Sequence, residues 1–306
     1  MEFKAVNIGV LTINDFNFHP NRRLRQAAKK QGHDIILINP YDMTAGIKKG
    51  EFEYSIDQIN KSLDVVMPRQ GSPMGDYGLV LLRHFSNMGI PLVNNLKSII
   101  IARNQFITLQ ALASSGILVP NTCFITKKEL FLKAVNKIDG FPVIVKQVDG
   151  MGGDGIIKIN NEKESIFFLE NNLKEKKGVL VQQFIPSENR IDIRVMVIGG
   201  KVAGAMKLES RNNDFRTNIH QNGKAQKIDL SKDLEKLAIK SAKVCNLEIA
   251  GVDILMENSC HPLVIEVNYS PGFQGLEAAT GLDIAQQIIN YVSSTHGNTN
   301  HTGQAL

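Results

Sequence analysis

A cluster of glycines directly follows an apolar run that contains one lysine, Lys146. The stretch reads VIVKQVDGMGGDGIIKI over residues 143–159. Its clustered glycines are Gly150, Gly152, Gly153 and Gly155. Glycine lets backbone N–H groups approach anionic oxygens closely, and a lysine on the preceding strand would add a point charge on a phosphate chain. Taken alone, the stretch is compatible with a loop that closes over phosphates and equally with a mobile hairpin.

Two common phosphate-binding loops do not fit this stretch. Gly150, Gly152 and Gly155 match the spacing G-x-G-x-x-G, but a dinucleotide fingerprint requires its glycines to open a helix. Here the glycines lead into IIKI, which is β-branched and typical of a strand. A Walker A loop needs Gly-Lys-Ser/Thr after the glycines, and that sequence is absent. The expected arrangement is therefore strand, glycine loop, strand.

Acidic side chains interrupt two apolar strands near the end of the sequence. In HPLVIEVNY (261–269), the two-residue period of a strand places Glu266 and Asn268 on one face. Asp253 interrupts AGVDILME (250–257) in the same way. Burying a carboxylate is costly unless it is paired or bound to metal, and three oxygen ligands suit Mg²⁺ or Mn²⁺. A metal site is favoured over a solvent-facing sheet because Glu266 and Asn268 lead into a turn.

Two further polar clusters have simpler alternatives. NDFRTNIHQNG (213–223) carries Arg216 and Asn218 in a segment polar enough to be an ordinary surface loop. Asp192 and Arg194 lie two apart on an apolar strand, where an internal salt bridge or a solvated edge would also explain them.

The first 95 residues alternate between strand and helix patterns, which predicts a parallel sheet. Strands are expected at 8–13, 35–40, 64–69 and 91–95, and helices at 20–32 and 76–89. A long apolar helix is expected over 96–116, ended by Gly116.

After residue 120 the pattern changes to one of mixed strands and helices. Strands are expected at 122–126, 141–148, 156–159 and 179–185, with helices at 127–138 and 163–176. A hairpin around Gly199-Gly200, a helix capped by Ser231, strands at 251–257 and 261–269, and a helix at 281–294 follow. The domains expected are 1–95, 96–185 and 186–295, followed by a disordered tail at 296–306.

Composition narrows the functional classes. The chain has 306 residues, 43% hydrophobic and 21% charged, which is ordinary for a globular protein. Its net charge of +5 and its pI of about 9.0 indicate a mildly basic surface. A nucleic-acid groove would need aromatic residues beside the basic runs, and Trp is absent, so we expect no nucleic-acid partner.

The sequence also indicates where the protein works. No apolar run reaches the ~20 residues that span a bilayer, and the N-terminal stretch lacks a basic leader and a cleavage site, so we expect neither a membrane partner nor a signal peptide. Three widely spaced cysteines without a CxxC pair argue against disulfides or zinc and favour the cytoplasm. Oligomeric state is not readable, and a homo-oligomer stays open.

Together these motifs resemble the ATP-grasp superfamily, and within it the RimK-type amino-acid ligases. The matching stretches cover nearly the whole chain: MPRQGSPMGDYG with LLRHFSNMG, IARNQFITLQALASSGI, PVIVKQVDGMGGDGI, VQQFI, DIRVMVIG, NDFRTNIHQNG, AGVDIL and VIEVNYSPGFQGLEAATGLDIA. The last three are very specific, whereas the glycine loop alone is not.

The resemblance implies an α/β and α+β architecture with the ATP-grasp fold. Its three lobes would comprise a parallel α/β N-terminal domain and two α+β units that hold ATP between them. Lys146 would contact the phosphates, and the glycine loop with Gly152 and Gly153 would close over them. The adenine edge would meet a segment made of Gln182, Gln183, Phe184 and Ile185. Asp192 would face the ribose side.

The resemblance also implies the catalytic groups. Asp253, Glu266 and Asn268 would hold two Mg²⁺ (or Mn²⁺) ions. Arg194 and Arg216, with Asn218 beside them, would stabilise the phosphate or acyl phosphate.

Three positions depart from the family pattern. Gln105 stands where the family usually has a lysine, Gln183 replaces a common acidic residue, and KLESR (207–211) replaces the usual arginine before the NDFR loop. Lys207 or Arg211 are candidates to compensate for that arginine. These changes leave open a different substrate, weaker ATP binding or reduced activity.

The function expected is an ATP-dependent carboxylate–amine ligase that works through an acyl phosphate and adds glutamate or a related amino acid to a peptide or protein. The alternatives are a small-molecule ligase, such as a glutathione-synthase-like or cofactor-glutamylating enzyme, and an ATP-binding homologue with reduced catalysis. The acceptor choice falls to the N-terminal lobe, where Arg69 and Tyr77 are candidate contributors, although either could be structural.

Overall fold

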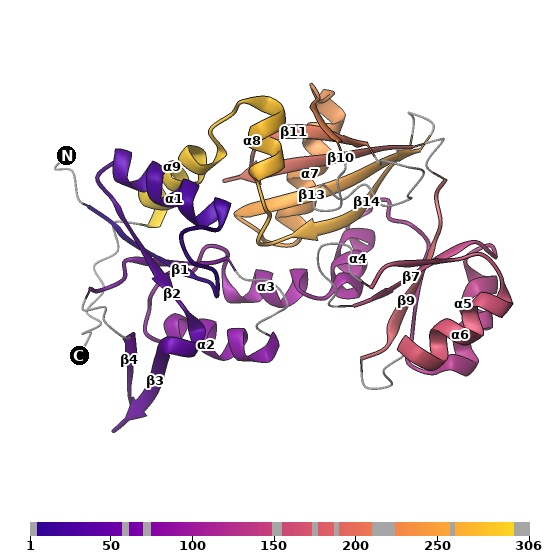
Figure 1. Ribbon diagram of the computed structural model, residues 1–306, viewed down its shortest axis with the longest axis horizontal. Coiled ribbons are helices and arrows are strands. Elements are labelled where there is room, and N and C mark those ends of the chain that lie inside the picture. The colour runs from indigo at the N-terminus through magenta and orange to yellow at the C-terminus, as the bar shows by residue number, and fades with distance from the viewer. Residues whose placement is uncertain are drawn as a thin grey trace.

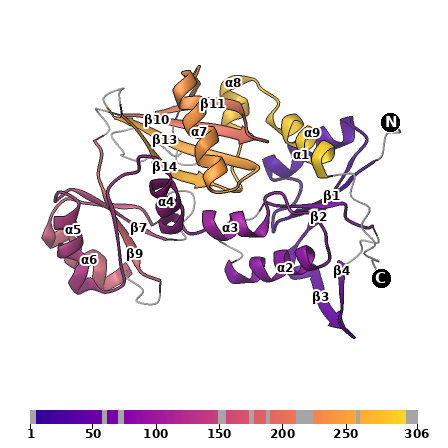
Figure 2. The same ribbon diagram turned by 180° about the vertical axis from the view of Figure 1, so that it is seen from behind.

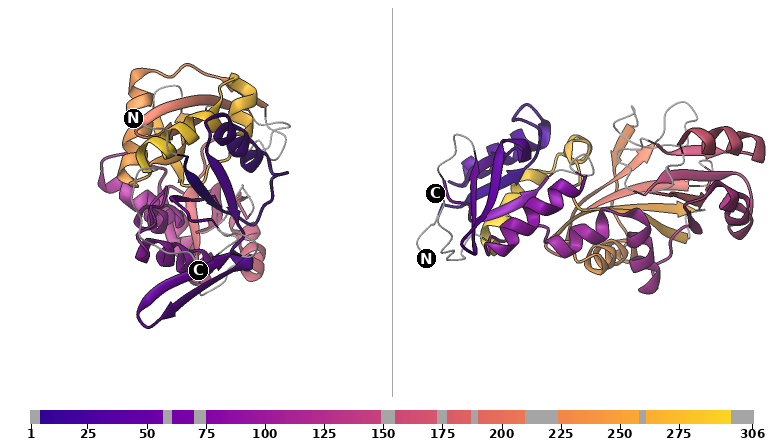
Figure 3. Two further views of the ribbon diagram at one scale, coloured as in Figure 1. Left: turned by 90° about the vertical axis from the view of Figure 1, so that its left-hand side faces the viewer. Right: turned by 90° about the horizontal axis from the view of Figure 1, so that it is seen from below.

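The structure, a computed structural model, describes residues 5–56, 61–69, 75–148, 155–172, 177–186, 190–209, 224–257 and 261–296. Within these ranges the chain has a mixed α/β fold in which three main sheets follow one another along the long axis of the molecule (Figure 1). The view from below shows the same succession (Figure 3, right). None of the helices in the described part of the chain has both the length and the apolar character needed to cross a membrane.

The N-terminal sheet is parallel, as the alternating pattern predicts. Its order is β2-β1-β5, with β1 at Asn7–Leu11, β2 at Asp34–Ile38 and β5 at Val65–Pro68. The helices α1 (His19–Lys30) and α2 (Gly75–Asn87) are present near their expected places.

The strand expected at 91–95 is reduced to a single bridge between Val66 and Leu92, so that prediction is wrong in extent. The chain bends at Val93 and Asn94, and the side chain of Asn94 bonds to the backbone of Glu248 and Ile249.

A projecting hairpin in this region was not expected from the sequence. It joins β3 (Met43–Lys48) to β4 (Glu51–Ile56) and follows a short 3-10 helix, Pro40–Asp42. Lys49 and Gly50 form its turn, both with positive φ, as a tight two-residue hairpin requires. The hairpin extends away from the rest of the chain in both ribbon views (Figures 1 and 2).

The long helix expected over 96–116 is wrong, because two helices occupy that stretch. They are α3 (Leu96–Ala102) and α4 (Gln105–Ser114). The side chain of Asn104 accepts hydrogen bonds from the backbone N–H groups of Phe106 and Ile107, so Asn104 begins a new helix. Asparagine favours this capping position over a helix interior, which accounts for the break.

The second sheet is small and antiparallel. Its order is β6 (Thr122–Ile125), β9 (Val179–Gln183), β7 (Val143–Gln147) and β8 (Ile157–Ile159). Two helices, α5 (Phe131–Lys137) and α6 (Glu162–Asn172), pack on one face. The β7–β8 pairing confirms that the glycines connect two antiparallel strands, while residues 149–154 themselves lie outside the described part.

The third sheet is larger and also antiparallel. Its order is β12 (Lys224–Lys227), β11 (Lys201–Glu209), β10 (Arg190–Ile198), β13 (Ile249–Glu257) and β14 (His261–Asn268). The expected hairpin joins β10 to β11 through Gly199 and Gly200, both with positive φ. The helix α7 (Lys232–Val244), capped by Ser231 as predicted, packs on one face through Ala238 and Ala242.

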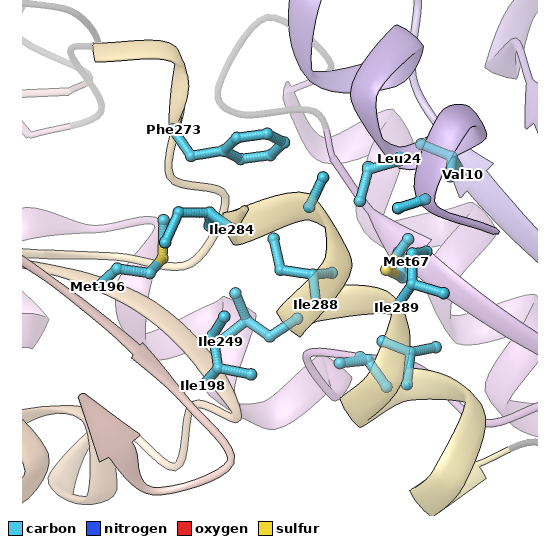
Figure 4. Packing of buried hydrophobic residues seen from close by; sticks show 14 of the residues in the cluster. Val10, Leu24, Met67, Met196, Ile198, Ile249, Phe273, Ile284, Ile288 and Ile289 are labelled. Atoms are coloured by element: carbon cyan, nitrogen blue, oxygen red, sulfur yellow. The ribbon is translucent and has the colours of Figure 1, made fainter. Parts of the chain in front are cut away.

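The last two helices connect the large sheet to the N-terminal sheet. They are α8 (Gln274–Thr280) and α9 (Ile284–His296). In Figure 4, Ile284 and Ile288 of α9 lie between Met196 of the large sheet and the N-terminal Leu24 and Met67, in one buried cluster. The helix α9 includes His296, where the disordered tail was expected to begin, and residues 297–306 lie outside the described part.

Candidate functional site

The small sheet has one face covered by helices and one face turned away from them. Val143 and Val145 pack under α5 and α6, so the alternation of a strand directs Ile144 and Lys146 to the opposite face. Register adds Lys158 and Gln182 to that face, since both lie directly opposite Ile144 on neighbouring strands. This face therefore combines an apolar side chain with two lysines and an amide.

Lys146 on this face is nearly inaccessible to water. Its relative exposure is 7%. Burial lowers the pKa of Lys146 to about 8, and the charge of Glu266 opposes that shift. Because Glu266 belongs to β14 of the large sheet, the two sheets come together at this lysine.

On the large sheet, three charged residues form a row across adjacent strands. Arg194 of β10 lies opposite Asp253 of β13, and Asp253 lies opposite Glu266 of β14. Residues paired in this way are neighbours on one face. The Arg194 guanidinium donates from Nε and Nη2 to the two Asp253 oxygens, at 2.6 and 2.5 Å.

Opposing effects act on the ionisation of this row. Asp253 raises the pKa of Arg194, which therefore stays charged. Burial and the neighbouring charge of Asp253 raise the pKa of Glu266, while Arg194 and Lys146 partly offset the rise. Two carboxylates side by side in a half-buried place are a donor set that a divalent cation would neutralise.

The third expected metal ligand, Asn268, lies two residues beyond Glu266 and opposite Gly251. Its Oδ1 accepts a hydrogen bond from the backbone N–H of Ser270 at 2.8 Å, which fixes the side chain. In the described ranges no group of three or more His, Cys, Asp or Glu side chains is placed to hold a metal, so any site here needs the amide as its third donor. The structure thus brings Asp253 and Glu266 together as predicted, and their binding of metal stays a prediction.

The segment expected to meet adenine begins at the end of β9. Gln182 donates through Nε2 to Thr122 Oγ1 at 2.8 Å, and the Gln183 backbone N–H donates to the Asn121 carbonyl at 2.9 Å. The Lys158 ammonium lies 4.1 Å from the centroid of the Phe184 ring. These contacts fix the segment against β6 and β8, and its role toward adenine stays a prediction.

Sequence reasoning missed Arg190, which fixes the end of the same segment. Its Nη1 donates to the Ile185 carbonyl at 2.8 Å, and its Nε lies 3.0 Å from Asp192 Oδ1 in an ion pair whose two side chains are each 9% exposed. Asp192 thus pairs with Arg190, while Arg194 pairs with Asp253. No signal in the sequence identifies Arg190, because its partners depend on how the chain folds back.

Gln105 connects the two sheets. Its side-chain Nε2 donates to the Ile265 carbonyl at 3.2 Å, and its backbone N–H donates to the Val148 carbonyl at 2.9 Å. The register of β13 and β14 shifts between Asp253 and Ile254, which leaves Ile265 as the extra residue of a bulge. An uncharged side chain, that of Gln105, thus bonds to the strand residue next to the carboxylate of Glu266.

The remaining candidates fall into two groups. Gly152, Gly153, Arg211, Arg216 and Asn218 lie outside the described residues. Lys207 lies opposite Ile193, and Ile193 faces α7. Lys207 is therefore on the other face of the sheet from Arg194. The suggestion that Lys207 compensates for the missing arginine is wrong. Tyr77 donates to the Pro40 carbonyl and stacks on Tyr41, which are structural contacts.

Models of known protein families match nearly the whole chain. The RimK-like ATP-grasp domain model matches residues 102–292, and the RimK PreATP-grasp domain model matches residues 6–99. A curated relative, the "Probable alpha-L-glutamate ligase" of Syntrophotalea carbinolica, is 36% identical over 291 residues, covering 94% of this chain and 95% of its own.

Solved structures share the fold at lower identity. The RimK domain protein ATP-grasp from Sphaerobacter thermophilus has a TM-score of 0.71 at 21% identity and covers 94% of this chain and 99% of its own. The ATP-grasp ligase PsnB, solved with a phosphomimetic variant of its minimal precursor, Mg and ADP, has a TM-score of 0.71 at 18% identity and covers 96% and 99%.

Proposed function

The chain belongs to the RimK-like ATP-grasp family, and from this premise we propose that it is an ATP- and Mg²⁺-dependent ligase that adds L-glutamate to a peptide or protein. The observation that carries the proposal is the meeting of Lys146 on the small sheet with the row Arg194, Asp253 and Glu266 on the large sheet. A cation from one sheet and carboxylates from the other suit a phosphate chain with its metal ions.

ATP would lie between the open face of the small sheet and the charged row. Lys146 would bind the phosphates, and Gln182, Gln183, Phe184 and Ile185 would border the adenine. Asp192 would face the ribose while it is held by Arg190. The glycine loop, with Gly152 and Gly153, would cover the phosphates and exclude water, which protects a reactive intermediate from hydrolysis.

Asp253, Glu266 and Asn268 would hold two Mg²⁺ ions, with Mn²⁺ as a substitute. When bound, these ions neutralise charge on the transferring phosphoryl group. PsnB, a structural neighbour, was solved with Mg and ADP, which supports the same cofactors here. The donor set contains no sulfur or imidazole, as expected for a hard cation.

The reaction proposed has two steps. An oxygen of the acceptor carboxylate forms a bond to the γ-phosphorus of ATP, and the bond to the β-phosphate oxygen breaks, which gives an acyl phosphate and ADP. The amine of glutamate then attacks the acyl carbon, phosphate leaves, and the amine loses a proton. Arg194, together with Arg216 and Asn218, would stabilise the charge on the phosphate in both steps.

The nature of the acceptor and the location of the enzyme are also proposals. PsnB was solved with a precursor, which supports a peptide acceptor, and the curated relatives are named for glutamate. Cys123 and Cys245 are unpaired, which suits a cytoplasmic protein.

Mass spectrometry tests the proposal. The protein is incubated with ATP, Mg²⁺, L-glutamate and a peptide fraction of a cell extract, and products are compared with a reaction that lacks ATP. We expect an ATP-dependent mass increase of one or more glutamate residues on a peptide or protein. A glutamate addition found only on a small molecule would favour the small-molecule ligase, and ATP binding without any product would favour a non-catalytic homologue.

A further inference from the structure

Arg69 occupies the position in the N-terminal sheet where a ligand is expected. It is the first residue after β5, and its backbone N–H donates to the carbonyl of Leu11 at the end of β1. The strand order β2-β1-β5 reverses direction at β1. In open parallel sheets, ligands bind in the crevice outside the carboxyl ends of the strands at such a reversal.

The Arg69 guanidinium contacts the loop that follows the proposed metal site. Its Nη2 donates to the Pro271 carbonyl at 2.7 Å, and its Cζ lies 5.6 Å from the centroid of the Phe273 ring. Its Nε is buried and has no hydrogen-bond partner among the described residues. Burial lowers the pKa of Arg69 to about 10, so the group is still a cation at neutral pH.

The charge of Arg69 lacks the partner that comparable arginines have. The other described arginines that are half-buried, namely Arg23, Arg103, Arg190 and Arg194, each form an ion pair with a carboxylate. Arg69 forms none with a described residue. A desolvated charge without a counter-ion is costly, and a guanidinium matches the two oxygens of a carboxylate.

The position of Arg69 relative to the proposed reaction defines which carboxylate it would meet. Pro271 is three residues beyond Asn268, which is about 10 Å of chain at most. Only one carboxylate is phosphorylated in the proposed reaction, and it belongs to the acceptor. The glutamate that supplies the amine brings two carboxylates that do not react and that need a cation other than those on the phosphates.

We infer that Arg69 binds a non-reacting carboxylate of the incoming glutamate, and so helps to select an acidic amino acid. This inference rests on the proposed function and extends it to the substrate. It makes Arg69 a specificity residue contributed by the N-terminal sheet, whereas the phosphates are bound by the other two sheets.

Calorimetric binding tests the inference without requiring turnover. L-glutamate, its α-amide and its γ-amide (L-glutamine) are titrated into the full chain with Mg²⁺ and a non-hydrolysable ATP analogue. We expect wild type to bind glutamate at least about tenfold more tightly than one of the amides, because that amide lacks the carboxylate that the Arg69 guanidinium binds. Arg69→Gln should lose at least about tenfold in glutamate affinity and should no longer distinguish that amide.

Two further variants separate this role from a structural one. Arg69→Lys keeps the positive charge but not the paired N–H donors of a guanidinium, and should keep only part of the affinity for glutamate. Arg83→Gln, a change at an exposed arginine of α2, should behave as wild type. Affinity for the ATP analogue, measured on the same samples, should be unchanged in all variants.

Several results would overturn the inference. The first is that wild type does not bind glutamate, or does not distinguish glutamate from either amide. The second is that Arg69→Gln binds glutamate normally. The third is that Arg69→Gln loses affinity for nucleotide and glutamate together. If Arg69→Gln does not fold, the inference still fails if wild type distinguishes neither amide or if Arg69→Lys binds glutamate as tightly as wild type. Arg69-dependent glutamate binding without ADP release would contradict the proposed ligase function alone, and ligation with normal glutamate affinity in Arg69→Gln would contradict this inference alone.

Discussion

Lys146 is charged in surroundings that disfavour its charge. It is 7% exposed, and burial outweighs the attraction of Glu266, so its pKa falls to about 8. A lysine in this condition gains most from an anionic ligand, because phosphate oxygens replace the water that burial removed. Gln105 supplies no second charge nearby. Lys146 would therefore carry a larger share of the proposed phosphate binding than it would with a lysine at position 105.

ATP affinity should therefore fall as the pH rises through about 8. The protonated lysine attracts phosphates and the neutral one does not, so above its pKa binding must take up a proton. We expect the Kd for ATP with Mg²⁺ to weaken about tenfold between about pH 7.5 and about pH 9, measured by calorimetry. Lys146→Arg stays charged throughout and should show little change over that range. An equally steep pH dependence in Lys146→Arg would assign it to another group.

Magnesium binding at Glu266 should stabilise the folded protein. Glu266→Gln keeps the shape of the side chain and removes its carboxylate. Burial and the charge of Asp253 raise the pKa of Glu266, which means that they disfavour its charged form, so the metal-free variant should fold normally. Mg²⁺ with ATP should raise the melting temperature of wild type and not of the variant. ADP release should fall by more than about a hundredfold, since metal stabilisation supplies several kcal/mol.

A matched control for this change is Glu235→Gln on the exposed side of α7, which should respond to Mg²⁺ as wild type does. Equal magnesium stabilisation in Glu266→Gln would show that Glu266 does not hold the metal.

Single residues of the site differ in how far the sequence could predict them. The two-residue period of the apolar strands predicts the face on which each carboxylate lies, but it does not specify the register that pairs Asp253 with Glu266, which includes a bulge. The partners of Asp192 and Arg194 were not predictable, since each depends on which side chain the fold places within reach.

At the level of elements, the break between α3 and α4 positions Gln105. Asn104 begins α4 with two hydrogen bonds to its first turn, and Gln105 then bonds to both Val148 and Ile265. The start of this one helix thus holds an end of β7 against the bulge of β14. A continuous helix could not present Gln105 in this way.

Asn104→Ala should destabilise the protein by about 1 kcal/mol, because the first turn of α4 loses its cap. For a chain of this size the melting temperature should fall by about 1.5 °C. Asn104→Asp can still accept both hydrogen bonds and should restore most of the stability. Thermal denaturation of the three proteins checks this, and equal stability of Asn104→Ala and wild type would contradict it.

Elements with strong local signals were predictable, and elements defined by long-range packing were not. Gly199-Gly200 and Ser231 specify a turn and a helix start by themselves. The β3–β4 hairpin was missed because Lys49-Gly50 is a weak turn signal, and α3–α4 was misjudged because its apolar pattern continues across Asn104.

In the whole molecule, Asn94 joins the N-terminal sheet to the large sheet. Its side-chain Nδ2 donates to the carbonyls of Ile249 and Tyr269, and its Oδ1 accepts from the N–H groups of Glu248 and Ile249. The residue is 2% exposed, so these bonds replace water completely. Nothing in the sequence shows that Asn94 would bond to backbone groups more than 150 positions away.

Asn94→Ala should cost about 3 kcal/mol, because it leaves buried backbone groups unsatisfied across the joint. The melting temperature should fall by about 5 °C, and the helix α9 between the two sheets should make them unfold together. Asn290→Ala on the exposed side of α9 is the control and should change stability by less than about 0.5 kcal/mol. Two separate transitions in wild type would contradict a single joined core.

ADP release is the most direct test of whether Lys146 and Glu266 take part in an ATP-dependent ligation. Wild type, Lys146→Ala and Glu266→Ala are each incubated with ATP, Mg²⁺, L-glutamate and an acceptor found by mass spectrometry, and ADP is measured together with the amide product. We expect wild type to form ADP and amide in equal amounts, and both products to fall by more than about a hundredfold in each variant. Undiminished ADP release and ligation in the two variants would contradict this expectation.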